Sequence, residues 1–198
     1  MSLMDQLTQV VTQQVTQQAA NKTGLNEGIA DKMMPMAMAA IMAGLKKNAS
    51  SPDGAAALAN ALDNHDGSLL NNVSGLGNDN VIADGQKILG HILGGKQQQT
   101  EMALAKSAGV DQSQIAQLLA MAAPAVLASL GRAKREQGLD ASALAGLVTE
   151  ESVRFQKSAP AELGGLMNFL DQDGDGDFKD DLMEAAGKKL LGGLFGRK

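Results

Sequence analysis

The chain begins with apolar residues at helical spacing. Between residues 3 and 20, Thr and Gln fill most positions that the apolar residues leave free. The apolar positions are Leu3, Leu7, Val10, Val11 and Val15. This spacing places them on one face of a helix. We therefore expect an N-terminal amphipathic helix over residues 1–22, which either docks onto the core or pairs with another chain.

Two longer apolar segments, residues 33–45 and 118–130, follow similar start signals. Asn26 precedes the first segment and Asp111 the second, and both residue types favour the N-cap of a helix. Gln114 completes a capping-box pattern with Asp111. Basic residues follow both segments, as the negative end of a helix dipole prefers. The shared order predicts that the chain repeats one helical unit.

A second helix follows in each predicted unit. Ser51 is a good N-cap and Pro52 suits the first turn of a helix over the next ten residues or so. Asp140 is the corresponding cap of a helix that includes residues 143–148. The match extends the predicted repeat by one more element.

Each predicted unit then closes with an Asp-Gly turn and a glycine-bearing helix. The two helices cover residues 85–96 and 187–198. A glycine inside a helix costs about 1 kcal/mol relative to alanine, so its recurrence needs a reason. Gly90 and Gly94 lie four positions apart on one face. Their spacing predicts close approach to a neighbouring helix.

These elements predict an all-α fold, a helical bundle made of two tandem related helical units plus the N-terminal amphipathic helix. The predicted division has four parts, namely residues 1–22 for the N-terminal helix, 23–96 for the first unit, 97–108 for a connecting helix and 109–198 for the second unit. Composition agrees, because the chain has no Trp, no Tyr and only 4 Phe, but 11 Met. Sheets draw on aromatic residues, whereas Met fills gaps between helices.

The methionines of residues 33–42 allow two interpretations. They fill the core between helices, or they form an adaptable apolar surface for a partner. The segment 33–45 is too short to span a bilayer and is interrupted by Pro35. We therefore expect no transmembrane segment.

Charge and cysteine content exclude some functions. The net charge is −5, without a long basic run, so a nucleic-acid partner is not expected. The absence of Cys excludes disulfides and thiolate metal sites. The N-terminus shows no secretory signal, which predicts a cytoplasmic location and leaves unconventional export open.

An aspartate-rich loop between residues 171 and 181 carries the main chemical signal. Its candidate ligands are Asp171, Asp173, Asp175, Asp177, Asp180 and Asp181. Calcium takes six to eight oxygen ligands, and alternate side chains on a tight loop converge on such an ion. Gly176 permits the turn, but Leu182 stands where an EF-hand has its bidentate Glu. We expect a calcium site, with magnesium or manganese as alternatives.

The first unit holds a related turn at residues 64–73. It keeps Asp66 and Gly67, but Asn or Ser replaces most of the other aspartates. We expect a structural turn that caps the next helix through its side-chain oxygens. His65 and His91 are too few for a closed metal site of their own.

No pattern in the sequence indicates a catalytic nucleophile beside a base. The favoured function is a non-catalytic calcium-binding helical protein that acts through protein–protein contacts or self-association. One alternative is peripheral membrane contact through residues 188–198, which are basic at both ends and apolar between. Another alternative is an uncharacterised enzyme.

Several runs of this sequence resemble the bacterial domain-of-unknown-function family 937, the YidB-like proteins. The matching features are Pro35 in an apolar helix that ends at Gly44-Leu45, the runs 65–70 and 83–94, and the run Leu170 to Asp181 with Gly187-Lys188. The resemblance covers most of residues 24–198. It implies a small helical protein and assigns no catalytic residue.

Overall fold

A computed structural model of the chain describes residues 16–71 and 73–158, and every regular element in these ranges is a helix. The α-helices are α2 (Thr16–Thr23), α3 (Glu27–Asn48), α4 (Pro52–Ala61), α5 (Asp79–Leu93), α6 (Gln97–Ala108), α7 (Gln112–Gln137) and α8 (Ala141–Ser158). Short 3-10 turns are η2 (Leu62–Asn64), η3 (Ser68–Asn71), η4 (Val73–Gly77) and η5 (Gly94–Lys96). The predicted all-α class is confirmed.

Helix starts follow the predicted caps. The Asn26 side chain accepts a hydrogen bond from Gly28 N at 2.9 Å, and Ser51 accepts one from Gly54 N at 3.1 Å. Gln114 Oε1 accepts from Asp111 N at 3.2 Å, and Asp140 accepts from Ala143 N at 2.8 Å. These bonds satisfy backbone N–H groups at or next to helix starts.

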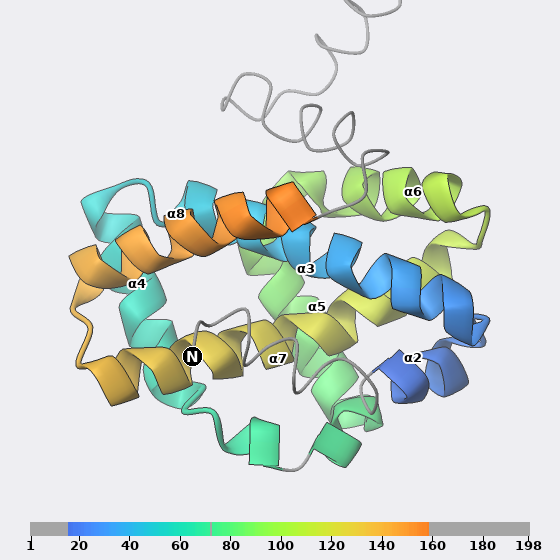
Figure 1. Cartoon of the computed structure of the whole chain (residues 1–198), viewed down its shortest axis with the longest axis horizontal. Helices are drawn as coiled ribbons and strands as arrows, with labels where there is room; N and C mark the ends of the chain where they lie inside the picture. Colours follow the sequence, from blue (N-terminus) through green and yellow to red (C-terminus); the bar gives the residue numbers. More distant parts are fainter. Residues whose placement is uncertain (1–15, 72, 159–198) are drawn as a thin grey trace, which may run out of the picture.

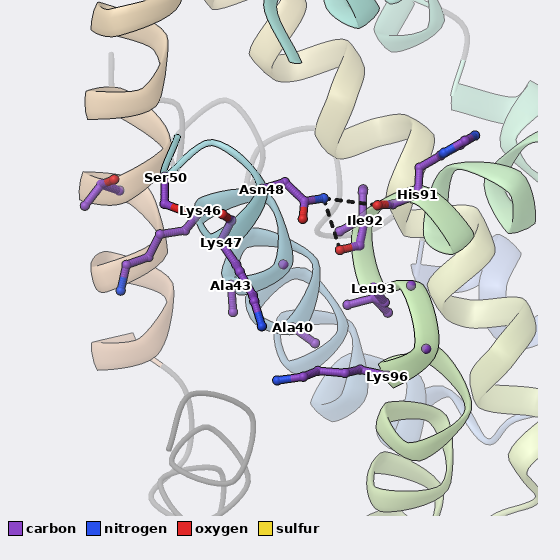
Figure 2. A pocket seen from close by; sticks show the side chains of 14 residues that line it. Ala40, Ala43, Lys46, Lys47, Asn48, Ser50, His91, Ile92, Leu93 and Lys96 are labelled. Atoms are coloured by element: carbon purple, nitrogen blue, oxygen red, sulfur yellow. Dashed lines mark hydrogen bonds between the residues drawn. The ribbon is translucent and has the colours of Figure 1, made fainter. Parts of the chain in front are cut away.

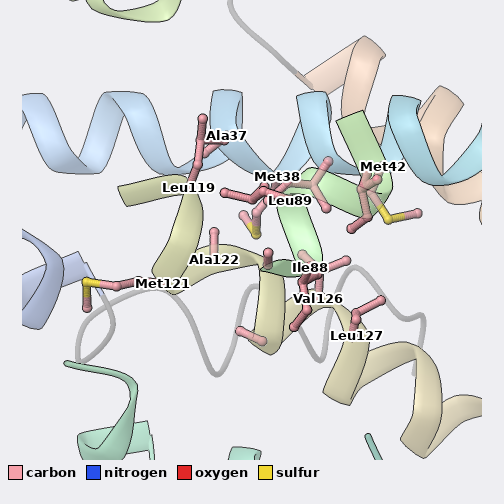
Figure 3. Close-up of a cluster of buried hydrophobic side chains, with 14 of the residues drawn as sticks. Ala37, Met38, Met42, Ile88, Leu89, Leu119, Met121, Ala122, Val126 and Leu127 are labelled. Carbon is pink, nitrogen blue, oxygen red and sulfur yellow. The ribbon is translucent and has the colours of Figure 1, made fainter. Parts of the chain in front are cut away.

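Helix α7 lies at the centre of the bundle and contacts α2, α3, α5 and α6 (Figure 1). Its residues from Leu118 to Gly131 are all buried. Helix α3 packs against it with methionines at 33, 34, 36, 38 and 42, each buried. Figure 3 shows Met38 and Met42 beside Leu89 of α5 and Val126 of α7. The methionines therefore fill the core, and the alternative of an adaptable surface at these residues is wrong.

Helix α3 does not stop at its proline. It continues through Pro35 from Glu27 to Asn48, so this proline lies inside an apolar helix, as the sequence predicted. Proline removes one bond to the carbonyl four residues earlier. That residue is Asp31, which is exposed, so water can replace the lost donor.

Among the described residues, α7 is the one helix long and apolar enough to cross a membrane, with a mean hydropathy of 1.5 over the relevant window. In the bundle, 83% of that window is buried. The core helix of a soluble protein meets the same criterion, so this is weak evidence for a membrane span.

Glycines mark close approaches, but at positions other than those predicted. A Cβ on Gly85 of α5 would overlap the carbonyl of Ala120 in α7, and one on Gly131 would overlap the carbonyl of His65. At Gly90 the nearest atom would be 3.9 Å away, and at Gly94 nothing lies within 4 Å. The close approach predicted at Gly90 and Gly94 is therefore wrong. Gly94 instead has a φ of +53°, which ends α5.

The two long helices begin alike. Gly24 precedes α3 and has a φ of +70°, and Gly109 precedes α7 and has a φ of +67°. Each long helix contains a proline and is followed by a further helix, α4 or α8. The buried side chains of all the α-helices form one hydrophobic core. The tandem relation remains a prediction, because residues 187–198 lie outside the described residues.

Candidate functional site

The predicted metal ligands fall beyond the described part of the chain. Asp171, Asp173, Asp175, Asp177, Asp180 and Asp181 all lie outside residues 16–158. The calcium site therefore stays a prediction. Within the described residues, no group of three or more His, Asp or Glu side chains is placed to hold a metal ion.

The turn at residues 64–73, which the sequence predicts to be related to the aspartate loop, lies within the described residues up to Asn71. Asp66 Oδ1 accepts a hydrogen bond from Ser68 N at 2.9 Å, and Gly67 has a φ of +88°. Leu70 N donates to Gly67 O at 3.1 Å, which closes the first turn of η3. Asp66 thus caps the short 3-10 turn that follows it, whereas the next α-helix, α5, begins only at Asp79 and has Asn78 as its N-cap.

Three cationic side chains from the end of α7 bind the oxygens of this turn. Arg132 Nη2 donates to Gly67 O at 3.1 Å and to the side-chain oxygen of Asn71 at 2.8 Å. Lys134 Nζ lies 2.5 Å from Asp63 Oδ1 and also donates to the carbonyl of Ala59. The sequence indicated only that basic residues suit a helix C-terminus. Their contacts with the turn depend on how α7 packs against η2 and η3, which the sequence pattern does not show.

The charge of Asp66 is stabilised in the same turn. The hydroxyl and the backbone N–H of Ser68 lower the pKa of Asp66, and the guanidinium of Arg135 lowers it further. Arg135 Nη1 lies 3.4 Å from Asp66 Oδ2. Lys134 therefore compensates the charge of Asp63, and Arg135 compensates that of Asp66. The two carboxylates beside His65 thus have cationic partners without a metal ion.

A cleft of about 520 Å³ opens where α3 and α5 end and α8 passes by (Figure 2). We call it the lysine cleft, because Lys46 and Lys47 of α3 and Lys96 of η5 line it. Its floor includes Ala40, Ala43, Ile92 and Leu93, and Thr149 of α8 forms part of its wall. No Asp or Glu is among the lining residues. The cleft is thus a cationic hollow with an apolar floor in an acidic protein.

The position of the cleft depends on a tight joint between α3 and α5. Asn48 Nδ2 donates to His91 O at 3.1 Å and to Ile92 O at 3.2 Å, the carbonyls at the end of α5. Carbonyls in the last helical turn have no partner within the helix. Gly44 allows the approach, since a Cβ there would lie 2.7 Å from Ile92 Cγ2.

A second cavity of about 500 Å³ adjoins the first and is more apolar. Leu45, Leu58, Ile88 and Leu127 line it, together with both histidines. Asn48, His91 and Ile92 line both cavities, so the α3–α5 joint separates them. The sequence did not reveal either cavity, because their walls come from segments far apart in the chain.

The described residues form an all-α bundle with one hydrophobic core. It has an Asp-Gly turn whose oxygens are bound by Lys and Arg side chains, and a cleft lined by three lysines. The model of a family described as bacterial protein of unknown function (DUF937) matches residues 5–133. The chain belongs to this family. Comparison with curated proteins and with solved structures finds no match. The family match ends within α7, ahead of the aspartate loop at residues 171–181.

Proposed function

We propose that this protein is a non-catalytic calcium-binding helical protein whose aspartate loop at residues 171–181 takes one calcium ion. The observation that carries the proposal is the chemistry of the related turn at residues 64–73. There, oxygens of Gly67 and Asn71 are bound by Arg132, and the carboxylate of Asp63, immediately before the turn, is bound by Lys134. A turn of this kind therefore gathers oxygens that require positive charge.

The loop of the second unit carries more negative charge than its counterpart. Asp173, Asp177 and Asp180 correspond to Asn64, Ser68 and Asn71 in the described turn. Each change replaces a neutral oxygen with a carboxylate. Close carboxylates repel one another unless a cation lies between them, and calcium accepts all-oxygen ligand sets. A structural role follows for the ion, because the related turn joins two helical segments.

Calcium titration of the full chain tests this proposal directly. We expect heat of binding in calorimetry and a higher melting temperature in calcium than in chelator. At a hundredfold excess over Kd, linkage predicts about 2.7 kcal/mol of added stability. Asp175→Ala should abolish both effects.

The matched control is Asp66→Ala, which makes the same change in the related turn. It should leave calcium binding intact, since Asp66 already has Ser68 and Arg135 as partners. Absence of binding heat at millimolar calcium would rule out the site. Magnesium at the same concentration distinguishes a calcium site from a general divalent site.

We further propose that the protein acts through contacts with other protein chains or with itself. The lysine cleft and its apolar floor support this, because they offer charge and apolar area together. Elsewhere on the described surface, large exposed apolar side chains are scattered, as at Met102 and Val153. Light scattering after size exclusion, with and without calcium, separates a monomer from an assembly.

A further inference from the structure

The second cavity is a groove between α4 and α5, and we call it the α4–α5 groove. Leu45 of α3 and Leu127 of α7 lie beneath it, and both are buried. The two helices approach each other at one end. A Cβ on Gly54 of α4 would overlap the Asn48 carbonyl, and Asn48 Nδ2 donates to His91 O at the end of α5. Asn48 therefore marks the narrow end of the groove.

Helix α7 separates α4 and α5 at the other end of the groove. Gly85, near the start of α5, faces the Ala120 carbonyl, and Gly131 faces the carbonyl of His65, which follows α4. Ala120 and Gly131 lie about 16 Å apart along α7. The two helices therefore diverge from Asn48 and enclose about 500 Å³. A space of this size accommodates a drug-sized ligand or several apolar side chains.

The groove is apolar inside and open to solvent at its rim. Leu58 and Ile88 line its two walls and are buried. Ala57 and Ala61 of α4 and His91 of α5 also line it and are exposed. Among the described residues that line it, none is Asp, Glu, Lys or Arg. The groove thus suits an occupant that inserts apolar side chains.

Two acidic residues flank the α4–α5 groove. Asp84 lies one helical turn before Ile88 on the same face of α5, and Asp53 precedes Gly54 in the first turn of α4. Both carboxylates are exposed, and neither has a hydrogen-bond or ion-pair partner among the residues that the structure describes. An occupant with basic groups at both ends of an apolar run would match this arrangement.

We propose that residues 187–198 of the same chain dock in the α4–α5 groove. This segment repeats the apolar pattern of residues 85–96. Its apolar residues Leu190, Leu191, Leu194 and Phe195 correspond to Ile88, Leu89, Ile92 and Leu93 of α5. All four of these α5 side chains are buried in the bundle. The same pattern in the C-terminal segment needs an apolar surface to cover it, and the groove provides one.

The charges of the segment also fit the groove. Basic residues stand at both ends of its apolar run, namely Lys188, Lys189, Arg197 and Lys198. In the helix that the sequence predicts here, Lys189 and Arg197 lie about 12 Å apart. Asp84 lies about 12 Å along α5 from Ile92, whose carbonyl binds Asn48 at the narrow end, close to the start of α4. Basic and acidic groups can therefore pair at both ends of the groove.

The chain is long enough to reach the groove. Helix α8 packs against α4, which forms one wall, and ends at Ser158. Residues 159–186 can extend up to about 90 Å. This exceeds the length of α7, the longest described helix, which spans about 39 Å. The connection therefore allows docking within one chain.

A single tryptophan in the full chain tests the docking, because the sequence has no Trp or Tyr of its own. Phe195→Trp replaces one aromatic ring of the segment with another. We expect blue-shifted emission and weak quenching by acrylamide, since the groove shields the ring from water. Adding Ala57→Lys with Ala61→Lys places bulk and positive charge on the exposed wall. This groove variant should expose the ring and increase quenching severalfold.

The matched control adds Ala56→Lys with Asn60→Lys to the same tryptophan variant. Both residues are exposed in α4, and neither lines the groove. This control makes the same charge change and should leave quenching weak. Asp84→Lys tests the charge match separately and should increase quenching, whereas Asp31→Lys, at an exposed position of α3, should not. Circular dichroism verifies that each variant folds.

The outcomes separate docking in the groove from other positions of the segment. A ring that acrylamide quenches freely in the tryptophan variant overturns the docking, and so does equal quenching in the groove variant and its control. Shielding that disappears on dilution shows that the segment of a second copy occupies the groove, which refutes docking within one chain. A ring that is shielded only when vesicles of phosphatidylglycerol and phosphatidylcholine are added shows membrane contact and also refutes it. The calcium titration measures a separate site, so its failure leaves the docking intact.

Discussion

Replacing Gly85 with alanine should destabilise the protein, although alanine is the better helix former. Gly85 lies inside α5, and a Cβ there would overlap the backbone carbonyl of Ala120 in α7. The obstacle is backbone and not the end of a movable side chain. The two helices must therefore separate at the centre of the core, where Leu89 and Leu119 are fully buried.

The size of the effect follows from two opposing contributions. Overpacking a core costs about 1–3 kcal/mol, and a backbone obstacle places this case near the upper end. Removing a helical glycine gains about 1 kcal/mol. The net loss for Gly85→Ala is therefore about 2 kcal/mol, or about 4–8 °C in melting temperature for a chain of this size.

Gly90→Ala is the matched control in the same helix. Gly90 is exposed, and the nearest atom to an added Cβ would be 3.9 Å away. This variant should gain up to about 1 kcal/mol, so the two substitutions have opposite signs. Urea unfolding followed by circular dichroism measures both. If Gly85→Ala proves as stable as the unchanged protein, the close α5–α7 contact is wrong.

Three further predictions concern local contacts. Arg132→Met should lower the free energy of unfolding by about 1–3 kcal/mol, because Gly67 O and the Asn71 side chain lose a charged hydrogen-bond donor. An unchanged midpoint in urea unfolding would mean that Arg132 does not stabilise the turn. Ser51→Ala should cost about 1 kcal/mol through loss of the bond from Gly54 N to the N-cap, whereas Ser51→Thr, which keeps a hydroxyl, should cost less. The folded-state pKa of Asp66 is lowered, so its stabilisation is complete above its unfolded pKa near 4 and is lost as pH falls through the folded value. Unfolding midpoints of Asp66→Asn should therefore decline less between pH 5 and about pH 2 than those of the unchanged protein, and equal declines would contradict the assignment.

Local signals predicted local structure well in this chain. The caps at Asn26, Ser51, Asp111 and Asp140 could be recognised, because each bond joins residues only two or three positions apart. The core role of the methionines was one of two open interpretations. Sequence spacing cannot show what lies opposite a helix face, so only the packed bundle decided between them.

The two candidate sites differ in the same respect, because one is contiguous in the sequence and the other is not. The aspartate loop is contiguous, so the sequence alone reveals it. The lysine cleft is not, since Lys47 and Lys96 meet only where α3 and the end of α5 converge. In the sequence, Lys47 indicates a helix end and Lys96 a polar linker. The hydrogen bond from Arg132 to Gly67 O was missed for the same reason, because it depends on how α7 packs against a turn that is distant in the sequence.

The close helix approach that the sequence predicted at Gly90 and Gly94 occurs at Gly85. Gly90 and Gly94 share a helix face by spacing, but spacing does not show which face α7 contacts. The contact occurs at Gly85, opposite a carbonyl that lies four residues before a proline in the other helix. Pro124 has no N–H, so the Ala120 carbonyl four residues earlier loses its usual helical donor. That carbonyl faces Gly85, where the missing side chain leaves room for it. A proline in α7 and a glycine in α5 therefore form one packing feature, which neither sequence segment reveals alone.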